Sequence, residues 1–147
     1  MIDQSQRTNS LSFGSIEIDK TVQKLKSTSD SRKRYEYLLW IAKKLPTLPE
    51  NSFNESNKVK GCISKVYVLC EIVEGKLFWK GYSDALITKG MLALLINGLN
   101  NLSPKQIMKV DPTFIEATGL NKSLTPSRAN GFLNIFLKMK AQAQSFL

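Results

Sequence analysis

The feature that most constrains the fold is a change of hydrophobic period in the middle of the chain. From Lys65 onward apolar and polar side chains alternate, which is typical of a half-buried strand. Glu74 and Gly75 predict a turn, so residues 65–82 are expected to form a hairpin, with a shorter strand at 58–60 beside it. One face of the first strand carries Val66, Val68, Cys70 and Ile72, and the other carries Lys65, Tyr67, Leu69 and Glu71.

Apolar residues at helical spacing precede the hairpin. A first short helix is expected around Ile18, Val22 and Leu25. Ser31 is expected to cap a second helix, which Pro46 would end. The apolar face of this second helix comprises Tyr35, Leu38, Leu39, Ala42 and Leu45.

Four helices are expected after the hairpin. Ser83 opens a strongly apolar helix running to about residue 100, with Asp84 in its first turn, where a negative charge is favoured. A capping box at 103–106 begins the next helix, and a short one from 111 ends at Gly119. A last helix opens at 125–126, and its buried stripe is Phe132, Ile135, Phe136, Met139 and Ala143. Helices against a small antiparallel sheet of about three strands make the fold α+β.

Composition bounds the chemistry. The chain has 147 residues, 42% of them hydrophobic, enough for one domain with its own core, expected at 15–147 behind a flexible polar segment at 1–14. It contains no histidine and only two cysteines. Ser-His-Asp and Cys-His catalysis, imidazole-ligated zinc and clusters held by this chain's cysteines alone are therefore excluded, and no metal site is expected.

Charge and targeting signals limit the partners and the location that can be expected for the chain. The formal net charge is +9, and the densest basic run is Arg32-Lys33-Arg34. Such a run fits the solvated start of a helix, a nucleic-acid surface, or a face that steers the chain toward an acidic protein, and no finger, RNP or Gly-Arg pattern accompanies it. No secretory signal is evident, and the longest apolar run, 91–96, is too short for a membrane span. A cytoplasmic location is the expectation.

The two cysteines have different settings. Cys70 lies in the alternating strand and is expected to be a small buried hydrophobe. Cys62 follows Gly61, before the alternation begins, so we expect it in a loop, where nearby lysines would favour its thiolate. Eight residues of extended chain would separate the two by about 26 Å, far beyond disulfide reach. An accessible loop thiolate is suited to sulfur exchange, which needs no histidine.

A single arginine is unusually placed. Arg128 is expected at the third position of the last helix, where its charge meets the positive end of the helix dipole. The placement is unfavourable unless an anion compensates it. Arg128 is therefore either a surface or salt-bridged arginine or one directed at a carboxylate or a thiolate.

Three segments of the chain resemble the SufE family. Residues 61–67, Gly-Cys-Ile-Ser-Lys-Val-Tyr, are similar to its Gly-Cys-x-Ser-x-Val-aromatic segment. Residues 81–85 with Lys89 and Gly90 are similar to its Gly-x-Ser-Asp-Ala segment and the Lys-Gly that follows. Residues 124–131 are similar to its Leu-Thr-Pro-Ser-Arg-x-x-Gly segment. The resemblance covers about residues 17–145 in the family's order, and it implies a SufE/IscU-like fold.

The resemblance implies a sulfur acceptor that stimulates a SufS-type cysteine desulfurase. That partner, a pyridoxal-phosphate enzyme, takes sulfur from L-cysteine and holds it as a persulfide. Cys62 would accept the outer sulfur and pass it to an iron–sulfur scaffold complex. The chain itself would hold no cofactor and would not be a stand-alone desulfurase.

The resemblance also implies roles around Cys62. Arg128 falls near the family's active loop and would support the thiolate or persulfide anion, together with Gly61 and Ser64. Asp84 and Lys65 are candidates for supporting the loop or docking the partner. Since an exposed persulfide is lost by exchange, the Cys62 sulfur should be tucked away at rest on a loop more mobile than the hairpin.

Two other functions compete with sulfur transfer. An IscU-type cluster scaffold uses several cysteines, often with histidine, and one loop cysteine cannot serve as such a site. A basic nucleic-acid- or protein-binding module without sulfur chemistry remains the alternative. The resemblance favours a protein partner and neither nucleic acid nor a membrane. The sequence leaves a homodimer open.

Overall fold

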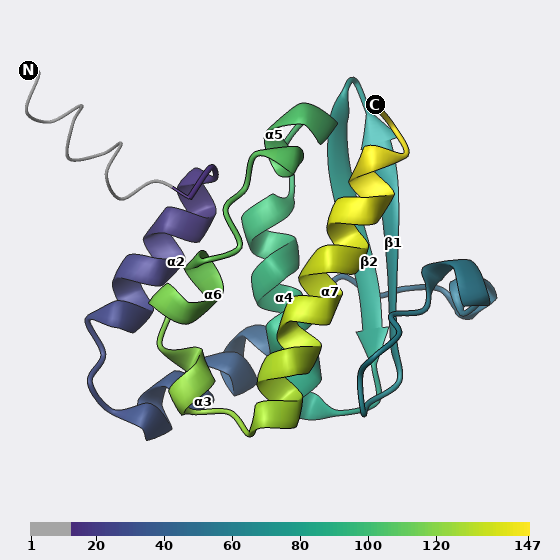
Figure 1. Ribbon diagram of the computed structural model, residues 1–147. Coiled ribbons are helices and arrows are strands. Elements are labelled where there is room, and N and C mark those ends of the chain that lie inside the picture. Colours follow the sequence, from purple (N-terminus) through teal and green to yellow (C-terminus); the bar gives the residue numbers. More distant parts are fainter. Residues whose placement is uncertain (1–12) are drawn as a thin grey trace, which may run out of the picture.

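A hairpin and a group of helices beside it make up the fold (Figure 1). The computed structural model describes residues 13–147. Helix α4 (Leu86–Leu99) runs through the centre and contacts α2 (Ile16–Lys26), α3 (Ser31–Ala42), β2 (Lys76–Ser83) and α7 (Pro126–Gln144). The α+β class is confirmed.

The hairpin forms as the sequence predicts. Strand β1 (Val66–Val73) pairs antiparallel with β2, from Val66 opposite Ser83 to Val73 opposite Lys76. Glu74 and Gly75 join them with φ angles of 51° and 79°, as a two-residue turn with two positive φ values requires. The buried face is shorter than expected, since Ile72 near the turn is exposed.

The predicted third strand at 58–60 is wrong. Within the described residues the sheet has two strands, and Lys58 makes only an isolated bridge to Tyr67, with the Val59 amide donating to the Val66 carbonyl. Gly61 explains why pairing stops there, because its φ of +80° turns the chain away from the sheet edge. Two short 3-10 turns, η1 (Glu50–Ser52) and η2 (Glu55–Asn57), precede this bridge.

Two predicted details of the N-terminal helices are wrong. Asp30, not Ser31, caps α3, because its carboxylate already accepts the Arg32 amide at 2.9 Å. The inward face of α3 also differs, with Tyr35 exposed and Arg34 buried. Most of the segment predicted to be flexible, 1–14, lies outside the described residues.

The start of α4 also differs from the prediction. Ser83 ends β2, and the helix begins at Leu86, so Asp84 is not in its first turn. The predicted capping box is present, with the Ser103 and Gln106 side chains accepting each other's backbone amides at the start of α5 (Pro104–Met108). Helix α6 (Phe114–Ala117) and the turn η3 (Leu120–Lys122) then lead into α7.

The core gathers around α4, which is buried on almost all sides. Gly90 allows α3 to approach, since a Cβ there would collide with the carbonyl of Leu38. The stripe predicted for α7 is confirmed: Phe132, Ile135, Phe136, Met139 and Ala143 are all buried. No helix within residues 13–147 has both the length and the apolar character needed to cross a bilayer.

Candidate functional site

The candidate site is built on the loop that leads from η2 into β1. Helix α7 holds this loop from one side. The Asn134 side-chain amide donates to the Gly61 carbonyl at 2.8 Å, and the Lys138 ammonium donates to the Ser56 carbonyl at 2.8 Å. The positive φ of Gly61, which other residues adopt only at a cost, turns Cys62 toward the helix.

The Cys62 sulfur is tucked between the loop and α7. Its thiol, half-buried, lies 3.7 Å from the Gly131 carbonyl and can donate to it. A Cβ placed on Gly131 would lie 3.5 Å from the sulfur, so the glycine leaves this side open. The sulfur lines a pocket of about 10 Å³, roughly the space of one water molecule. The pocket's other residues are Ile63, Ser64, Thr88, Met91, Ser127, Arg128 and Gly131.

Burial raises the pKa of the Cys62 thiol above its ordinary value. The expectation that nearby lysines favour the thiolate is therefore wrong for this resting conformation. Lys60 and Lys65 are exposed, and solvent screens their charges, whereas the sulfur itself is partly removed from water. The raised pKa favours the protonated, weakly reactive thiol in this conformation.

Arg128 reaches the same pocket from α7. It occupies the third position of the helix, and its backbone amide donates to the hydroxyl of the cap residue Thr125. Its half-buried side chain makes neither an ion pair nor a hydrogen bond to any residue of 13–147. Arg128 therefore lines the pocket of the Cys62 sulfur with a charge that no described residue pairs.

The other residues singled out from the sequence support the loop. The Ser64 and Thr88 hydroxyls are 3.0 Å apart, which joins the loop to α4. The Asp84 carboxylate accepts the Lys65 amide at 2.9 Å, and the Asp84 amide donates to the Lys65 carbonyl. Asp84 thus ties the end of β2 to the start of β1 and does not serve the α4 dipole, while the Lys65 side chain is exposed.

The second cysteine stands apart from this site. Cys70 lies in β1 opposite Trp79 and is half-buried against the core. Burial, with a smaller contribution from the charge of Glu71, raises the pKa of the Cys70 thiol to about 12. Both cysteines are free, as their predicted separation requires. Cys70 is consequently an inert thiol at neutral pH.

Sequence reasoning missed two residues that contact the loop. Gly131 borders the sulfur, and Asn134 holds Gly61. The sequence could have indicated them through their spacing from Arg128, because residues 128, 131 and 134 are three positions apart and therefore lie on one face of a helix. The loop they face could not be inferred from that spacing.

The basic run Arg32-Lys33-Arg34 does not form a continuous surface patch. Arg34 is buried, with 8% of its surface exposed, and Arg32 pairs with Glu36 at 3.6 Å. Only Lys33 remains an exposed cation of this run without an ion pair in the described chain. The nucleic-acid alternative loses its strongest support.

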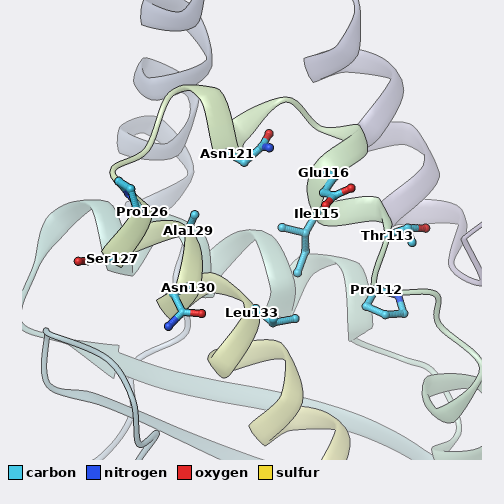
Figure 2. Close-up of a pocket in the computed structure, with 10 residues that line it drawn as sticks. All are labelled: Pro112, Thr113, Ile115, Glu116, Asn121, Pro126, Ser127, Ala129, Asn130 and Leu133. Atoms are coloured by element: carbon cyan, nitrogen blue, oxygen red, sulfur yellow. The ribbon is translucent and has the colours of Figure 1, made fainter.

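A roomier cavity of about 710 Å³ lies between α6 and the first turns of α7 (Figure 2). Glu116 is its single ionisable lining residue, and it contains no thiol. Figure 2 shows the Ser127 hydroxyl directed away from Ile115 and Leu133, and Ser127 also lines the Cys62 pocket. The cavity is thus a neighbour of the Cys62 site, separated from it by the first turn of α7.

In the part of the chain that the structure describes, no three or more histidine, cysteine, aspartate or glutamate side chains are grouped so that they could hold a metal ion. The site brings one sheltered thiol, that of Cys62, next to Arg128, a cation without an ion pair among residues 13–147.

Comparisons with known proteins identify relatives of this chain. The model of the family SufE, described as an Fe-S metabolism associated domain, matches residues 19–143. An uncharacterized SufE-like protein of Synechocystis is 50% identical over 127 residues, which are 86% of this chain and 80% of that protein. A protein of Plasmodium vivax named cysteine desulfuration protein SufE is 41% identical over 133 residues, 87% of this chain but 53% of that protein.

A solved structure shares the fold. The solution structure of a hypothetical protein from Thermus thermophilus superposes with a TM-score of 0.77 at 26% identity. The match covers 89% of this chain and 96% of that one. The overall fold is therefore found in an independently determined structure.

Proposed function

Because the chain belongs to the SufE family, we propose that it accepts sulfur as a persulfide on Cys62 from a SufS-type cysteine desulfurase and delivers it to iron–sulfur cluster assembly. The family description and the relative named for cysteine desulfuration support a sulfur-transfer role in Fe-S metabolism. The observation that carries the proposal is a sheltered thiol, Cys62, in one pocket with Arg128.

The transfer is a thiol exchange. The Cys62 thiol loses its proton, and the thiolate attacks the outer sulfur of a persulfide held on the desulfurase. A new sulfur–sulfur bond forms at Cys62 while the bond in the donor persulfide breaks, and the donor cysteine leaves as a thiolate. No electrons are gained or lost overall, so the step needs no metal or redox cofactor on this chain.

In the proposed transfer the Cys62 loop moves when the desulfurase docks. The raised pKa of the Cys62 thiol disfavours the attacking thiolate while the loop is closed. Docking of the desulfurase over the loop would draw the sulfur out toward the donor persulfide. Ile63, which is 79% exposed directly beside Cys62, provides an apolar contact for that partner.

Return of the loop would protect the product. The pocket of about 10 Å³ has space for about one added atom beside the Cys62 sulfur, and Arg128 supplies a positive charge for the persulfide anion. Shelter from water and small thiols slows loss of the outer sulfur. Delivery to the scaffold would reopen the same loop.

The experiment is a sulfur-loading assay read by intact mass. Wild type incubated with a SufS-type desulfurase and L-cysteine should gain the mass of one sulfur atom, and Cys70→Ser should gain it equally. Cys62→Ser should gain none. No added sulfur on wild type, or undiminished loading of Cys62→Ser, would sink the proposal.

A further inference from the structure

A third cavity, separate from the Cys62 pocket, lies where the turn between α2 and α3 meets the segment of α6 and η3. In Figure 1 these segments lie to the left of α4, and α2 contacts α6 while α3 contacts η3. The cavity has a volume of about 500 Å³, within the usual range for small-molecule sites. It shares no lining residue with the pocket of Cys62.

Arg34 is the buried cation of this cavity. It lines the cavity although only 8% of its surface is exposed. Its Nε donates to the Ser123 hydroxyl at 3.2 Å, and its Nη1 donates to the carbonyl of Thr28. Both acceptors are neutral, and within residues 13–147 Arg34 forms no ion pair. Buried charges are normally paired because desolvating an isolated one is costly, so this guanidinium lacks its usual compensation.

The remaining charges around the cavity make it strongly positive. Lys26 and Lys122 are exposed side chains in its lining, and neither forms an ion pair in the described chain. Glu116 is the one carboxylate of the lining and is likewise unpaired among residues 13–147. Three cations against one anion leave a net charge of +2 around the cavity.

The guanidinium also has donors left for a ligand. Two of its five N–H groups are used, and its Nη2 makes no hydrogen bond within the described residues. Gly119 lies against it: a Cβ there would come within 3.4 Å of the Arg34 Nε, at a φ of +77° that other residues rarely adopt. The glycine thus keeps a side chain away from the guanidinium.

We propose that this cavity binds the phosphate group of a small molecule. A phosphate dianion would neutralise the +2 lining, and its several acceptor oxygens suit a guanidinium fork with two flexible ammonium groups. The Ser29 hydroxyl in the lining supplies a further neutral donor. This cavity is separate from the Cys62 pocket, and the phosphate-binding proposal does not depend on the proposed sulfur transfer.

The test is a titration of the full chain with inorganic phosphate at constant pH and ionic strength, followed by amide and arginine NMR signals. The Arg34 Nε–H and the backbone amides of Gly119 and Lys122 should shift saturably, with a Kd near or below about 1 mM. Lys26→Gln combined with Lys122→Gln changes only exposed side chains and should weaken binding about tenfold or more. Lys105→Gln, an exposed lysine of α5, is the matched control and should leave binding unchanged.

Two further comparisons test whether the site prefers phosphate to other anions, and whether it needs the guanidinium of Arg34 and not only a positive charge. Acetate should bind much more weakly than phosphate, and Arg34→Lys, which keeps the charge but loses the fork, should also weaken binding. The proposal is overturned if these signals do not shift saturably up to about 20 mM phosphate, a level well above the expected Kd. It is equally overturned if the double lysine variant binds like wild type, or if acetate binds as tightly as phosphate.

Discussion

Replacing Gly131 with alanine should stabilise the fold and at the same time expose the persulfide. Gly131 lies inside α7, and a Cβ there meets a single neighbour, the Cys62 sulfur at 3.5 Å, which is ordinary van der Waals contact. Alanine is favoured over glycine in a helix interior by about 0.5–1 kcal/mol. We therefore expect Gly131→Ala to raise the free energy of unfolding by about that amount, or the Tm by about 1–4 °C.

The functional effect should have the opposite sign. The new methyl group would fill the side of the sulfur that the glycine leaves open, next to a pocket of only about 10 Å³. A second sulfur on Cys62 would then lack room at rest and would point toward solvent, where small thiols remove it by exchange. The persulfide of Gly131→Ala should be loaded but should decay several-fold faster than that of wild type.

Two measurements test this reasoning. Urea unfolding with an unchanged m value reports the stability, and intact mass followed over time in reduced glutathione reports the persulfide lifetime. Asn130→Ala is the matched control, because it also raises helix propensity on an exposed neighbouring position but does not touch the sulfur. A Gly131→Ala variant less stable than wild type, or one whose persulfide lives as long as that of wild type, would refute the packing argument.

Three further predictions concern the loop. Asn134→Ala removes the 2.8 Å hydrogen bond to the Gly61 carbonyl, which is worth about 1 kcal/mol, and should speed amide hydrogen exchange in residues 58–64 about fivefold. Asn130→Ala should leave this exchange unchanged. Equal exchange rates in the two variants would contradict the role of this hydrogen bond in holding the loop. Gly61→Ala places a Cβ at a φ of +80° and 2.5 Å from the Asn134 side-chain amide, so it should lower the free energy of unfolding, measured in urea, by about 1–2 kcal/mol. An unchanged midpoint of urea unfolding would contradict the closed conformation of the loop. Only the thiolate reacts with iodoacetamide, and burial raises the pKa of both thiols, so labelling of Cys62 should be slow at neutral pH and faster as the pH rises through its elevated pKa. Cys70 should be labelled only near pH 12. A midpoint for Cys62 labelling at or below the ordinary thiol pKa would show that the Cys62 sulfur is not sheltered.

Features that depend on neighbouring residues were predictable from the sequence. The Glu74-Gly75 turn, the capping box of α5 and the buried stripe of α7 each involve residues within a few positions of one another. Such features follow from backbone preferences and side-chain period, which act locally. Cys62 was found in the same way, since the glycine before it and the later onset of alternation place it in a loop.

The errors arose where a distant contact outweighed a local preference. Asp84 could equally have served the dipole of α4, but the amide of Lys65 competes for its carboxylate. Arg34 was expected on the surface, yet acceptors from Thr28 and Ser123 allow it to be buried. The residues 58–60 have strand-like composition, but only one bridge forms before Gly61 turns the chain.

The sequence by itself determined the α+β class and the presence of one loop cysteine in a chain without histidine. Only the tertiary structure decided how that cysteine is held. The sulfur meets Gly131 across 69 positions of sequence, and Asn134 holds Gly61 across 73. Contacts of this span exist only after the core around α4 has set the distance between α7 and the loop. The protonation of Cys62, the pocket it shares with Arg128 and the buried charge of Arg34 depend on that packing because each is a property of burial, which no local stretch of sequence encodes.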